Sequence, residues 1–325
     1  MTKRDEAEGI LLADVGGTNV RFAVLRGGKL GPVAYMAVTE YQQFAEGVAA
    51  FMATQADAHT IRYALFDAAG LVENGRCALT NNSWVVDAAE LAPRFGFAGI
   101  HIVNDFEAVA WSLPLMTADD LRMIGGRTPK PGAPMVVLGP GTGLGVAAYM
   151  PGNGGGSVVR GEGGHVTMPS SDAREDAIIA RLRQKLGHVS AERVVSGSGL
   201  ENIYWAIAAL ERQVVPERNA AAITQAAVAG TCAISRAALD TFCALLGEFA
   251  GNCALSFGAQ GGVFIAGGIA PRLRDYLPQS KFRSRFEAKG RMSRYLEAIP
   301  VYLILHEDPA FIGLRWLAQR RPWDS

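Results

Sequence analysis

The sequence predicts an α/β fold with two lobes and a cleft between them. Short apolar segments that alternate like β-strands are followed by segments with helical spacing, an order typical of α/β proteins. Glycine is abundant, at 38 of 325 residues, so the fold requires many tight turns or close approaches of the backbone. A Gly-Thr pair also occurs in two similar hairpins, at Gly17-Thr18 and Gly141-Thr142, 124 residues apart. A recurrence at this separation indicates two related lobes, not a short-period repeat.

The length and the charge balance narrow the class of protein. A chain of 325 residues exceeds what one compact core usually holds, so we expect two domains, or one domain with large insertions. Hydrophobic residues account for 49% of the chain and charged residues for 19%, which is typical of globular proteins and excludes a disordered or fibrous chain. The 31 basic residues balance the 31 acidic ones, and this neutrality argues against nucleic acid as a partner.

The cysteines and the apolar segments indicate neither a metal centre nor a membrane anchor. The four cysteines are Cys77, Cys232, Cys243 and Cys253. They form no CxxC pair and stand near no histidine at zinc-ligand spacing, so we expect reduced thiols in or near a core. The segment Met1–Gly9 lacks the apolar core of a signal peptide. Two charge-free stretches, 131–159 and 249–271, are too rich in glycine to cross a bilayer as helices. We therefore expect a cytoplasmic protein with no membrane partner.

The N-terminal part of the chain predicts a hairpin and a later strand-to-helix junction. An apolar run at Ile10–Ala13 leads into the glycine-rich segment Asp14–Asn19, and apolar residues then alternate over 20–24. This pattern is typical of a β-hairpin with a glycine turn. A further strand at Ile100–Val103 runs directly into Asn104-Asp105 and a helical pattern.

A helix near the N-terminus and the last two elements are predicted by similar signals. Apolar residues recur at helical spacing over 41–51, with Thr39 and Gln42 as its capping box. Near the other end, the apolar run Val301–Leu305 predicts a strand, and Asp308-Pro309 predicts the start of a helix. No low-complexity linker separates these elements, so we expect the lobes to meet at a hinge without a flexible tether.

The centre of the chain repeats the opening hairpin. The apolar run Met135–Leu138 leads into the turn Gly139–Gly145, and a strand resumes at Val146–Tyr149. A third glycine site, Gly267-Gly268, follows the apolar run Val263–Ala266. Three strands of this chain are thus predicted to lead into glycine-rich segments.

The two Gly-Thr turns suit the binding of a polyphosphate. Glycine turns expose N–H groups that can converge on an anion, and Thr18 and Thr142 each add a hydroxyl donor. The two commonest nucleotide loops, GxxxxGK[ST] and a strand-linked GxGxxG with its acidic residue, do not occur in the sequence. Asp14, at the end of the first strand, is placed to meet Mg²⁺ or its waters, because this ion prefers oxygen ligands. The alternative is a pair of ordinary hairpin turns.

Asn104 and Asp105 stand where a strand passes into a helix. An aspartate at this position commonly caps the helix. The carboxyl ends of strands in α/β sheets are also where ligands bind, and the neighbouring Asn104 supplies both a donor and an acceptor. Both interpretations of Asp105, helix cap and catalytic carboxylate, stay open on the residues alone.

The segment Gly161–His165 places one acid and one imidazole among three glycines. Such a loop can bring Glu162 and His165 close to a small molecule, and Glu192 follows downstream. Carboxylates, an imidazole and an amide, without a basic clamp for phosphate, suit a substrate with several hydroxyl groups. The alternative is a structural Glu–His pair that supports a glycine loop.

Together the motifs resemble those of bacterial ATP-dependent glucokinases, over nearly the whole chain from about Ile10. The motifs are Asp14-Val15-Gly16-Gly17-Thr18-Asn19, Asn104-Asp105-Phe106, Gly139-Pro140-Gly141-Thr142-Gly143-Leu144-Gly145, Gly161-Glu162-Gly163-Gly164-His165-Val166, Glu192-Arg193-Val194-Val195-Ser196-Gly197 and Gly261-Gly262-Val263-Phe264-Ile265-Ala266-Gly267-Gly268-Ile269. The first motif alone indicates only the broad superfamily of actin-like sugar kinases and chaperones. The glycine run around Glu162 and His165, with Glu192 after it, is much more specific.

The resemblance implies an actin-like ATPase (ribonuclease H-like) fold. The small α/β domain would comprise residues 1–112 and 306–325, and the large α+β domain residues 113–305. The implied reaction transfers the γ-phosphoryl group of ATP to the 6-hydroxyl of glucose, with Mg²⁺, giving glucose 6-phosphate and ADP as the first step of glycolysis. The resemblance also implies a homodimer, and the absence of a cysteine-rich motif agrees with a zinc-free member.

The resemblance also implies roles for the residues that match its motifs. Asp105 would be the general base, and it would hold the sugar together with Asn104, Glu162, His165 and Glu192. The nucleotide would lie against two phosphate turns and an adenosine segment, formed by Asp14, Gly16, Gly17, Thr18, Asn19, Gly141, Thr142, Gly143, Gly267 and Gly268. The segment Ala64–Gly70 departs from the family pattern, because it lacks the proline that usually follows this strand. This departure leaves the shape of a nearby loop, and with it sugar selectivity, open.

Three alternatives to a glucose kinase using ATP stay open. One is a regulatory protein of the same fold that binds sugar without turnover. Another is an actin-like ATPase or assembly protein, against which the Glu–His cluster argues. The third is a sugar kinase that phosphorylates another hexose or uses polyphosphate as its phosphoryl donor.

Overall fold

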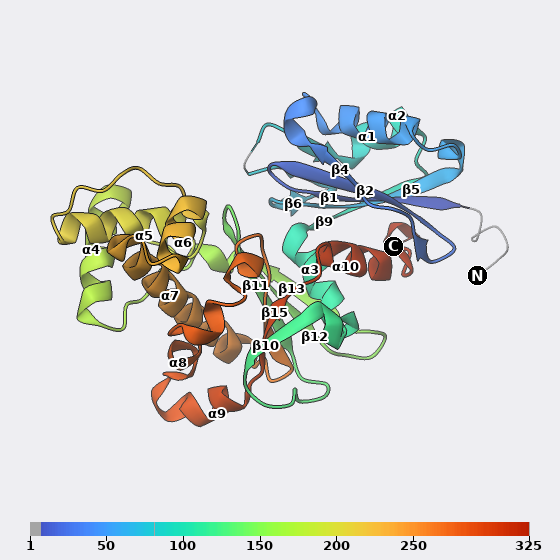
Figure 1. Cartoon of the computed structure of the whole chain (residues 1–325). Coiled ribbons are helices and arrows are strands. Elements are labelled where there is room, and N and C mark those ends of the chain that lie inside the picture. Colours follow the sequence, from blue (N-terminus) through green and yellow to red (C-terminus); the bar gives the residue numbers. More distant parts are fainter. Residues whose placement is uncertain (1–7, 81, 325) are drawn as a thin grey trace. The chain divides into compact units, whose positions relative to one another are not determined.

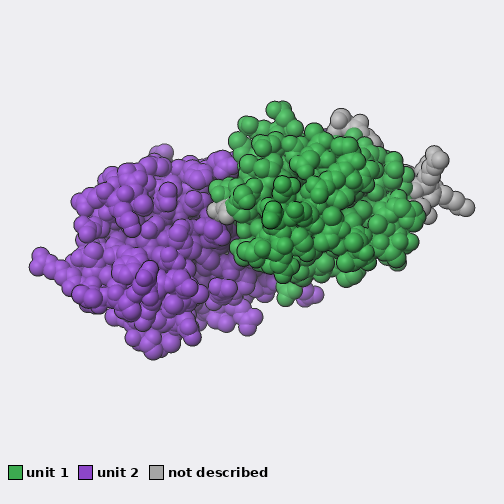
Figure 2. Space-filling model, turned by 90° about the horizontal axis from the view of Figure 1, so that it is seen from above, with its two compact units in different colours: residues 1–116, 307–325 green, residues 117–306 purple. Residues whose placement is uncertain are grey.

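The computed structural model describes residues 8–80 and 82–324, which divide between two units (Figure 2). Unit 1 comprises residues 1–116 and 307–325, and unit 2 comprises residues 117–306. The prediction that the segment Met1–Gly9 is not a signal peptide falls mostly on residues 1–7, which lie outside the described residues. The chain therefore leaves unit 1 once and returns to it with its C-terminal residues.

Unit 1 is built on a mixed sheet in the order β3-β2-β1-β5-β9, with β4 beside β2. Its strands are β1 (Gly9–Val15), β2 (Asn19–Arg26), β3 (Lys29–Leu30), β4 (Ala34–Ala37), β5 (Ile61–Ala68) and β9 (Gly99–Asn104). The predicted hairpin is confirmed, since β1 and β2 are antiparallel and Val15 pairs with Val20. β5 and β9 continue the sheet in parallel, which brings the carboxyl ends of β1, β5 and β9 to one edge.

Helices cover both faces of this sheet (Figure 1). The helices are α1 (Phe44–Ala53), α2 (Ala88–Phe95), α3 (Asp105–Ser112) and α10 (Pro309–Ala318). On one face, residues of α1 and α2 join the sheet in a core rich in phenylalanine; α3 and α10 pack together on the other face. A small sheet of β6 (Val72–Glu73), β7 (Arg76–Ala78) and β8 (Val85–Asp87) completes the unit.

Unit 2 has a sheet in the order β10-β15-β14-β11-β12-β13. The strands are β10 (Leu121–Gly125), β11 (Met135–Pro140), β12 (Leu144–Met150), β13 (Ser157–Gly161), β14 (Gly262–Ile265) and β15 (Val301–Ile304). β11 and β12 form the second predicted hairpin, with Pro140 paired to Leu144. β14 and β15 then follow β11 in parallel.

The two sheets repeat one plan, which confirms the predicted relation between the halves of the chain. In each, an antiparallel hairpin carries the glycine turn, a further antiparallel strand lies outside it, and two parallel strands follow on the other side. The Gly-Thr pairs therefore occupy the same position in both sheets, directly after the first strand of each hairpin.

The helices of unit 2 gather in one part of the unit and enclose most of its core (Figure 1). They are α4 (Ala173–Leu186), α5 (Gly197–Leu210), α6 (Ala220–Val228), α7 (Ala233–Phe257), α8 (Phe282–Glu287) and α9 (Ser293–Ala298). The long α7 packs against α5, α6 and α8 and also reaches the sheet at β11 and β14. It therefore connects the helical layer to the sheet.

The predicted start of the first helix is wrong by a few residues. Residues 38–40 form a short 3-10 turn, and α1 begins only at Phe44, so Thr39 and Gln42 do not make the capping box. The box is formed by Gln43 and Glu46, and the Glu46 carboxylate accepts from the N–H of Gln42 at 2.7 Å. The sequence does not reveal this start because glutamine is a weak N-cap residue.

The cysteines and apolar helices agree with the sequence analysis. Cys77, Cys243 and Cys253 are buried free thiols and Cys232 is half-buried, so the prediction of thiols in or near a core is confirmed. Within residues 8–80 and 82–324, no single helix is long and apolar enough to cross a membrane. Among the same residues, α6 and α7 taken together meet that requirement, and the pair is bent by 104°.

Candidate functional site

The first glycine turn lies at the edge of the unit 1 sheet and is fixed from both sides. The N–H of Gly16 donates to the carbonyl of Asn19 at 3.0 Å, and the Asn82 amide donates to the carbonyl of Gly17 at 3.1 Å. Thr18 and Asn19 are exposed, so the Thr18 hydroxyl is accessible to a ligand. Asn82 is a residue that sequence reasoning missed, because its contact with the turn spans 65 positions.

Asp14 is held by an arginine on the neighbouring strand. Arg21 pairs with Asp14 across β1 and β2, and its guanidinium donates to the Asp14 carboxylate at 2.6 Å. The same guanidinium lies 3.4 Å from the Asp308 carboxylate. The Asp14 side chain is therefore oriented by charge at the end of β1, a role for Arg21 that the sequence analysis did not identify.

Asp67 is a buried carboxyl beside this site that the sequence analysis also missed. It lies on β5 opposite Asp14, its side chain is fully buried, and no N–H or hydroxyl group among the described residues donates to its carboxyl oxygens. Burial raises the pKa of Asp67 well above its usual value, and the charges of Asp14 and Asp105 raise it further, whereas Arg21 lowers it. The only sequence signal was one acid within the apolar run that departs from the family pattern.

The structure resolves which of Asn104 and Asp105 caps the helix. Asn104 is the N-cap of α3, and its side-chain oxygen accepts from the N–H groups of Phe106 and Glu107 at 3.0 and 3.3 Å. Its amide nitrogen donates to the carbonyl of Gly70 at 3.2 Å. Asp105 is the first helical residue, half-buried, with one oxygen 3.0 Å from the N–H of Phe106. The cap interpretation of Asp105 is therefore wrong.

The second glycine turn lies at the edge of the unit 2 sheet, with Glu192 against it. The N–H of Gly141 donates to the carbonyl of Gly143 at 2.9 Å, which closes the turn. Thr142 is exposed at its tip. The N–H of Leu144 donates to the Glu192 carboxylate at 2.9 Å, so a predicted sugar residue contacts a predicted phosphate turn.

Glu162 and His165 lie on a short 3-10 turn beside β12. The His165 ring nitrogen is 3.8 Å from the Glu162 carboxylate, and the two side chains are 62% and 65% exposed. This exposure argues against a purely structural role for the Glu162–His165 pair, because side chains that support a loop are normally buried beneath it. Gly164 between them is buried, and a Cβ there would lie 2.2 Å from the carbonyl oxygen of Leu144.

The third glycine site packs against the second turn. Gly267 follows β14 with a positive φ of 83°, and a Cβ there would lie 2.5 Å from the carbonyl oxygen of Pro140. The N–H of Gly197, at the start of α5, donates to the carbonyl of Gly141 at 2.8 Å. Gly268 has open space around the position of a Cβ. Only glycine fits at position 267. Because it has no side chain, the predicted adenosine segment packs directly against the backbone of the second turn at Gly139 and Pro140.

Within each unit, the structure therefore brings most of the predicted residues together. Unit 1 holds the first turn, Asp14, Asn104 and Asp105 at the carboxyl edge of one sheet. Unit 2 holds the second turn with Glu162, His165, Glu192 and Gly267-Gly268 in one packed group.

Known proteins match this chain over nearly its whole length. The sequence profile of the Glucokinase family matches residues 11–321. The glucokinase of Paramagnetospirillum magneticum is 44% identical over 311 residues, covering 95% of this chain and 97% of that protein. The chain belongs to the glucokinase family.

Solved structures agree with the family. A glucokinase from an Antarctic psychrotroph is 32% identical, with a TM-score of 0.85, and the match covers 96% of this chain and 99% of that one. A glucokinase from Balamuthia mandrillaris, solved in complex with glucose, has a TM-score of 0.81 at 21% identity and covers 96% of this chain and 94% of that one. The fold is therefore the two-lobed actin-like ATPase fold, and the activity of this member of the glucokinase family is the phosphorylation of glucose by ATP.

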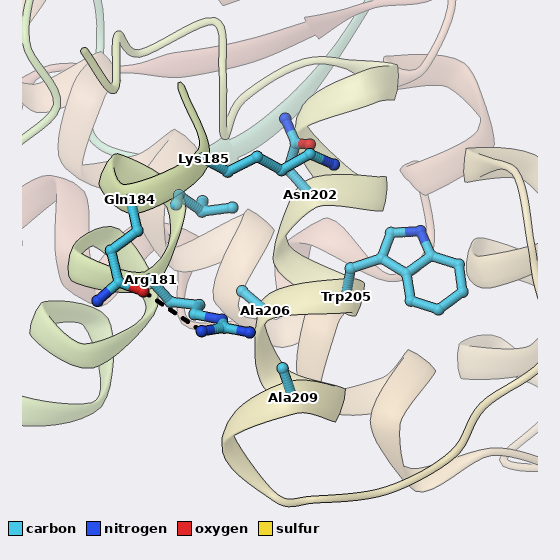
Figure 3. A pocket seen from close by; sticks show the side chains of 8 residues that line it. Arg181, Gln184, Lys185, Asn202, Trp205, Ala206 and Ala209 are labelled. Carbon is cyan, nitrogen blue, oxygen red and sulfur yellow. Dashed lines mark hydrogen bonds between the residues drawn. The ribbon is translucent and has the colours of Figure 1, made fainter. Parts of the chain in front are cut away.

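A groove of about 370 Å³ between α4 and α5 lies apart from the residues of the glucokinase motifs. Figure 3 shows Arg181, Gln184 and Lys185 of α4 on one side of the groove, with Lys185 extending toward Asn202 of α5, whereas the ring of Trp205 points away from α4. Its polar contacts are local, since Arg181 donates to Gln184 at 3.3 Å. No predicted site residue lines this groove.

Proposed function

We propose that Asp105 is the general base that takes the proton of the glucose 6-hydroxyl during phosphoryl transfer. The observation that carries the proposal is that Asn104, and not Asp105, caps α3. The Asp105 carboxylate is half-buried at the carboxyl end of β9, at the sheet edge where α/β folds bind ligands, and one of its oxygens accepts from the N–H of Phe106. A sugar hydroxyl is a weak nucleophile near neutral pH, and a positioned base typically contributes about 10²–10⁴-fold to the rate.

The sugar hydroxyls would be held by Asn104, Glu162, His165 and Glu192. The exposure of Glu162 and His165, more than half of each side chain, supports a role toward a ligand. Carboxylates and a histidine ring can each accept from or donate to a hydroxyl, so an inverted or missing hydroxyl leaves one of them unpaired. The glucose in the Balamuthia complex is the same class of ligand.

The ATP phosphates would lie on the two glycine turns, with Thr18 and Thr142 as hydroxyl donors and Gly267-Gly268 against the adenosine. Both threonines are exposed at the tips of their turns, which supports this proposal. In unit 1 the nucleotide group would comprise Asp14, Gly16, Gly17, Thr18 and Asn19, and in unit 2 Gly141, Thr142 and Gly143.

Magnesium fits this site as an ion carried by the nucleotide. Among residues 8–80 and 82–324, no group of three or more acidic, histidine or cysteine side chains could hold a metal ion. Asp14 is already paired with Arg21, so its carboxylate would reach the ion through water, and the phosphates would supply the direct ligands. When bound, Mg²⁺ neutralises charge on the phosphates and so favours approach of the hydroxyl.

We further propose a homodimer that acts in the cytoplasm. Both proposals rest on the resemblance to bacterial glucokinases. The mass in solution, measured by light scattering over a range of protein concentrations, tests the dimer. Cell fractionation tests the compartment.

The role of Asp105 is tested by substituting it with asparagine and measuring ADP release with and without glucose. Glu107→Gln is the matched control, because Glu107 is another acid in the first turn of α3. We expect Asp105→Asn to lower the turnover by at least about 10²-fold, as for loss of a general base, and Glu107→Gln to leave it nearly unchanged. Equally small losses of turnover in both variants would mean that Asp105 only stabilises the N-terminus of α3 by its negative charge, as Glu107 does.

The same assay separates the alternative functions. Glucose-dependent ADP release is expected of a sugar kinase, whereas an actin-like ATPase would release ADP without sugar. A regulatory protein would bind glucose without releasing ADP. A panel of hexoses and polyphosphate in place of the two substrates tests the strictness for glucose and ATP.

A further inference from the structure

The Glu192 carboxylate holds the second phosphate turn directly. The Leu144 N–H donates to its Oε2 at 2.9 Å, and a Cβ on Gly143 would lie only 2.5 Å from the same oxygen. Gly143 does not have a positive φ, so glycine there leaves room for the Glu192 carboxylate and is not required by backbone conformation. The carboxylate thus occupies the volume that a side chain at position 143 would take.

The backbone of Glu192 is itself fixed to the segment that carries Glu162 and His165. Its N–H donates to the carbonyl of Gly164 at 2.9 Å, and its carbonyl accepts from the Ser196 hydroxyl at 2.7 Å. Gly164 in turn packs against the carbonyl of Leu144. Through Glu192, three stretches far apart in the sequence form one hydrogen-bonded group at the edge of the unit 2 sheet.

We propose that Glu192 is a positioning residue for the turn 141–144 and that it couples the binding of sugar to the binding of nucleotide. This inference rests on the proposed function, in which Glu192 also contacts a sugar hydroxyl. The bond from an N–H to a carboxylate is stronger than a bond to a neutral acceptor, so Glu192 restricts the freedom of the turn. A bound sugar restricts the Glu192 side chain further. The turn 141–144 is then already ordered when the nucleotide binds, so nucleotide binding loses less conformational entropy. The two ligands therefore assist each other's binding.

Coupling of this kind is reciprocal, which makes it measurable from either ligand. If sugar tightens the binding of nucleotide by some factor, nucleotide tightens the binding of sugar by the same factor. Typical factors lie between about 5-fold and 150-fold. For the wild-type chain we expect saturating glucose to tighten ADP binding by at least about five-fold.

The test measures ADP and glucose binding by calorimetry on the full chain, each ligand alone and in the presence of the other. Glu192→Ala removes the carboxylate, and Gly143→Ala displaces it from the other side of the same contact. We expect both variants to bind ADP alone at least about five-fold more weakly and to lose most of the coupling. Glu162→Ala is the matched control, because it is expected to weaken glucose binding and leave the affinity for ADP alone unchanged.

The conservative variant Glu192→Gln distinguishes positioning of the turn from sugar contact. Its amide oxygen can still accept from the Leu144 N–H, so ADP affinity is expected to stay near wild type while glucose affinity falls. Wild-type ADP affinity and coupling in both Glu192→Ala and Gly143→Ala would overturn the proposal. If thermal unfolding shows that the alanine variants do not fold, Glu192→Asp is measured in their place. Its side chain is one methylene shorter, so the carboxylate no longer reaches the Leu144 N–H, and the same losses of ADP affinity and coupling are expected. Failure of the wild-type chain to bind glucose would instead refute the proposed function.

Discussion

The Asp67→Asn substitution is expected to stabilise unit 1 by an amount that grows with pH. The Asp67 carboxyl is fully buried on β5, opposite Asp14, and receives no hydrogen bond from an N–H or hydroxyl group of the described residues. Its pKa is raised in the folded state by burial and by the charges of Asp14 and Asp105. A buried carboxyl of this kind retains its proton, and a protonated Asp67 can donate toward Asp14.

The sign of the pH effect follows from proton binding. In the unfolded chain Asp67 has an ordinary pKa of about 3.9, so above that pH the folded state holds a proton that the unfolded state has released. The wild type therefore loses stability as pH rises from the unfolded pKa toward the raised folded pKa. The greatest slope for one group is about 1.4 kcal/mol per pH unit, which gives an upper limit of about 3 kcal/mol between pH 5 and pH 7. Asparagine has nearly the same shape as a protonated aspartate and does not ionise, so this loss is absent from the variant.

The assay is urea unfolding of the wild type and of Asp67→Asn at pH 5, 6, 7 and 8. The difference in the free energy of unfolding between them is expected to increase with pH, in favour of the variant, until the pH passes the raised pKa of Asp67 in the folded state, and to stay constant above it. Asp57→Asn, the same substitution at an exposed position of unit 1, is the control and is expected to leave the pH dependence unchanged. A difference that is constant with pH, or a variant that becomes less stable than the wild type at pH 8, would refute the reasoning.

Three further predictions concern the ligand turns and the packing of helices. Thr142→Val removes one hydroxyl from the second turn, so ATP affinity is expected to fall by about 1.5–3 kcal/mol in titrations of each ligand, and a loss confined to glucose would contradict the assignment. Glu162→Gln is expected to reduce the rise in melting temperature that glucose produces, while the melting temperature without sugar stays nearly unchanged because the side chain is 65% exposed. Gly313→Ala is expected to lower the melting temperature, at a cost of about 1–3 kcal/mol for overpacking, because its Cβ would lie 1.9 Å from the carbonyl oxygen of Ala108. Gly161→Ala, where a Cβ would meet nothing within 4 Å, is its control, and equal melting temperatures for the two variants would show that α3 and α10 adjust without cost.

The elements that carry the site could be predicted because their signals are local. An apolar run before each Gly-Thr pair and a second apolar strand segment after it predicted the two hairpins, which the structure confirms. The apolar run before Asn104 likewise predicted β9. These features depend on neighbouring residues only, so the sequence contains the information that determines them.

The parts of the site that could not be predicted depend on contacts between distant residues or on competition between equivalent ones. Asn104 and Asp105 are both good cap residues, and the local sequence does not show that Asn104 is the one that caps α3. The contact of Glu192 with Leu144 spans 48 positions, and no periodicity reports it. The burial of Asp67 follows from the central place of β5 between β1 and β9, which the composition of one strand does not show.

The return of the chain to unit 1 has a consequence for how the protein is made. Unit 2 is one continuous segment, 117–306, whereas unit 1 needs both the first 116 residues and the last 19. α10 covers the sheet face that holds β1 and β5 and packs closely on α3, and Trp323 stacks on Tyr63 of β5 at 4.7 Å. On the ribosome, where domains generally fold as units from the N-terminal end, unit 2 can complete its core before unit 1 can close its own. The edge of the unit 1 sheet that carries Asp105 is thus completed last, so a chain stalled before residue 307 contains the whole of unit 2 and exposes the apolar face that α10 would cover.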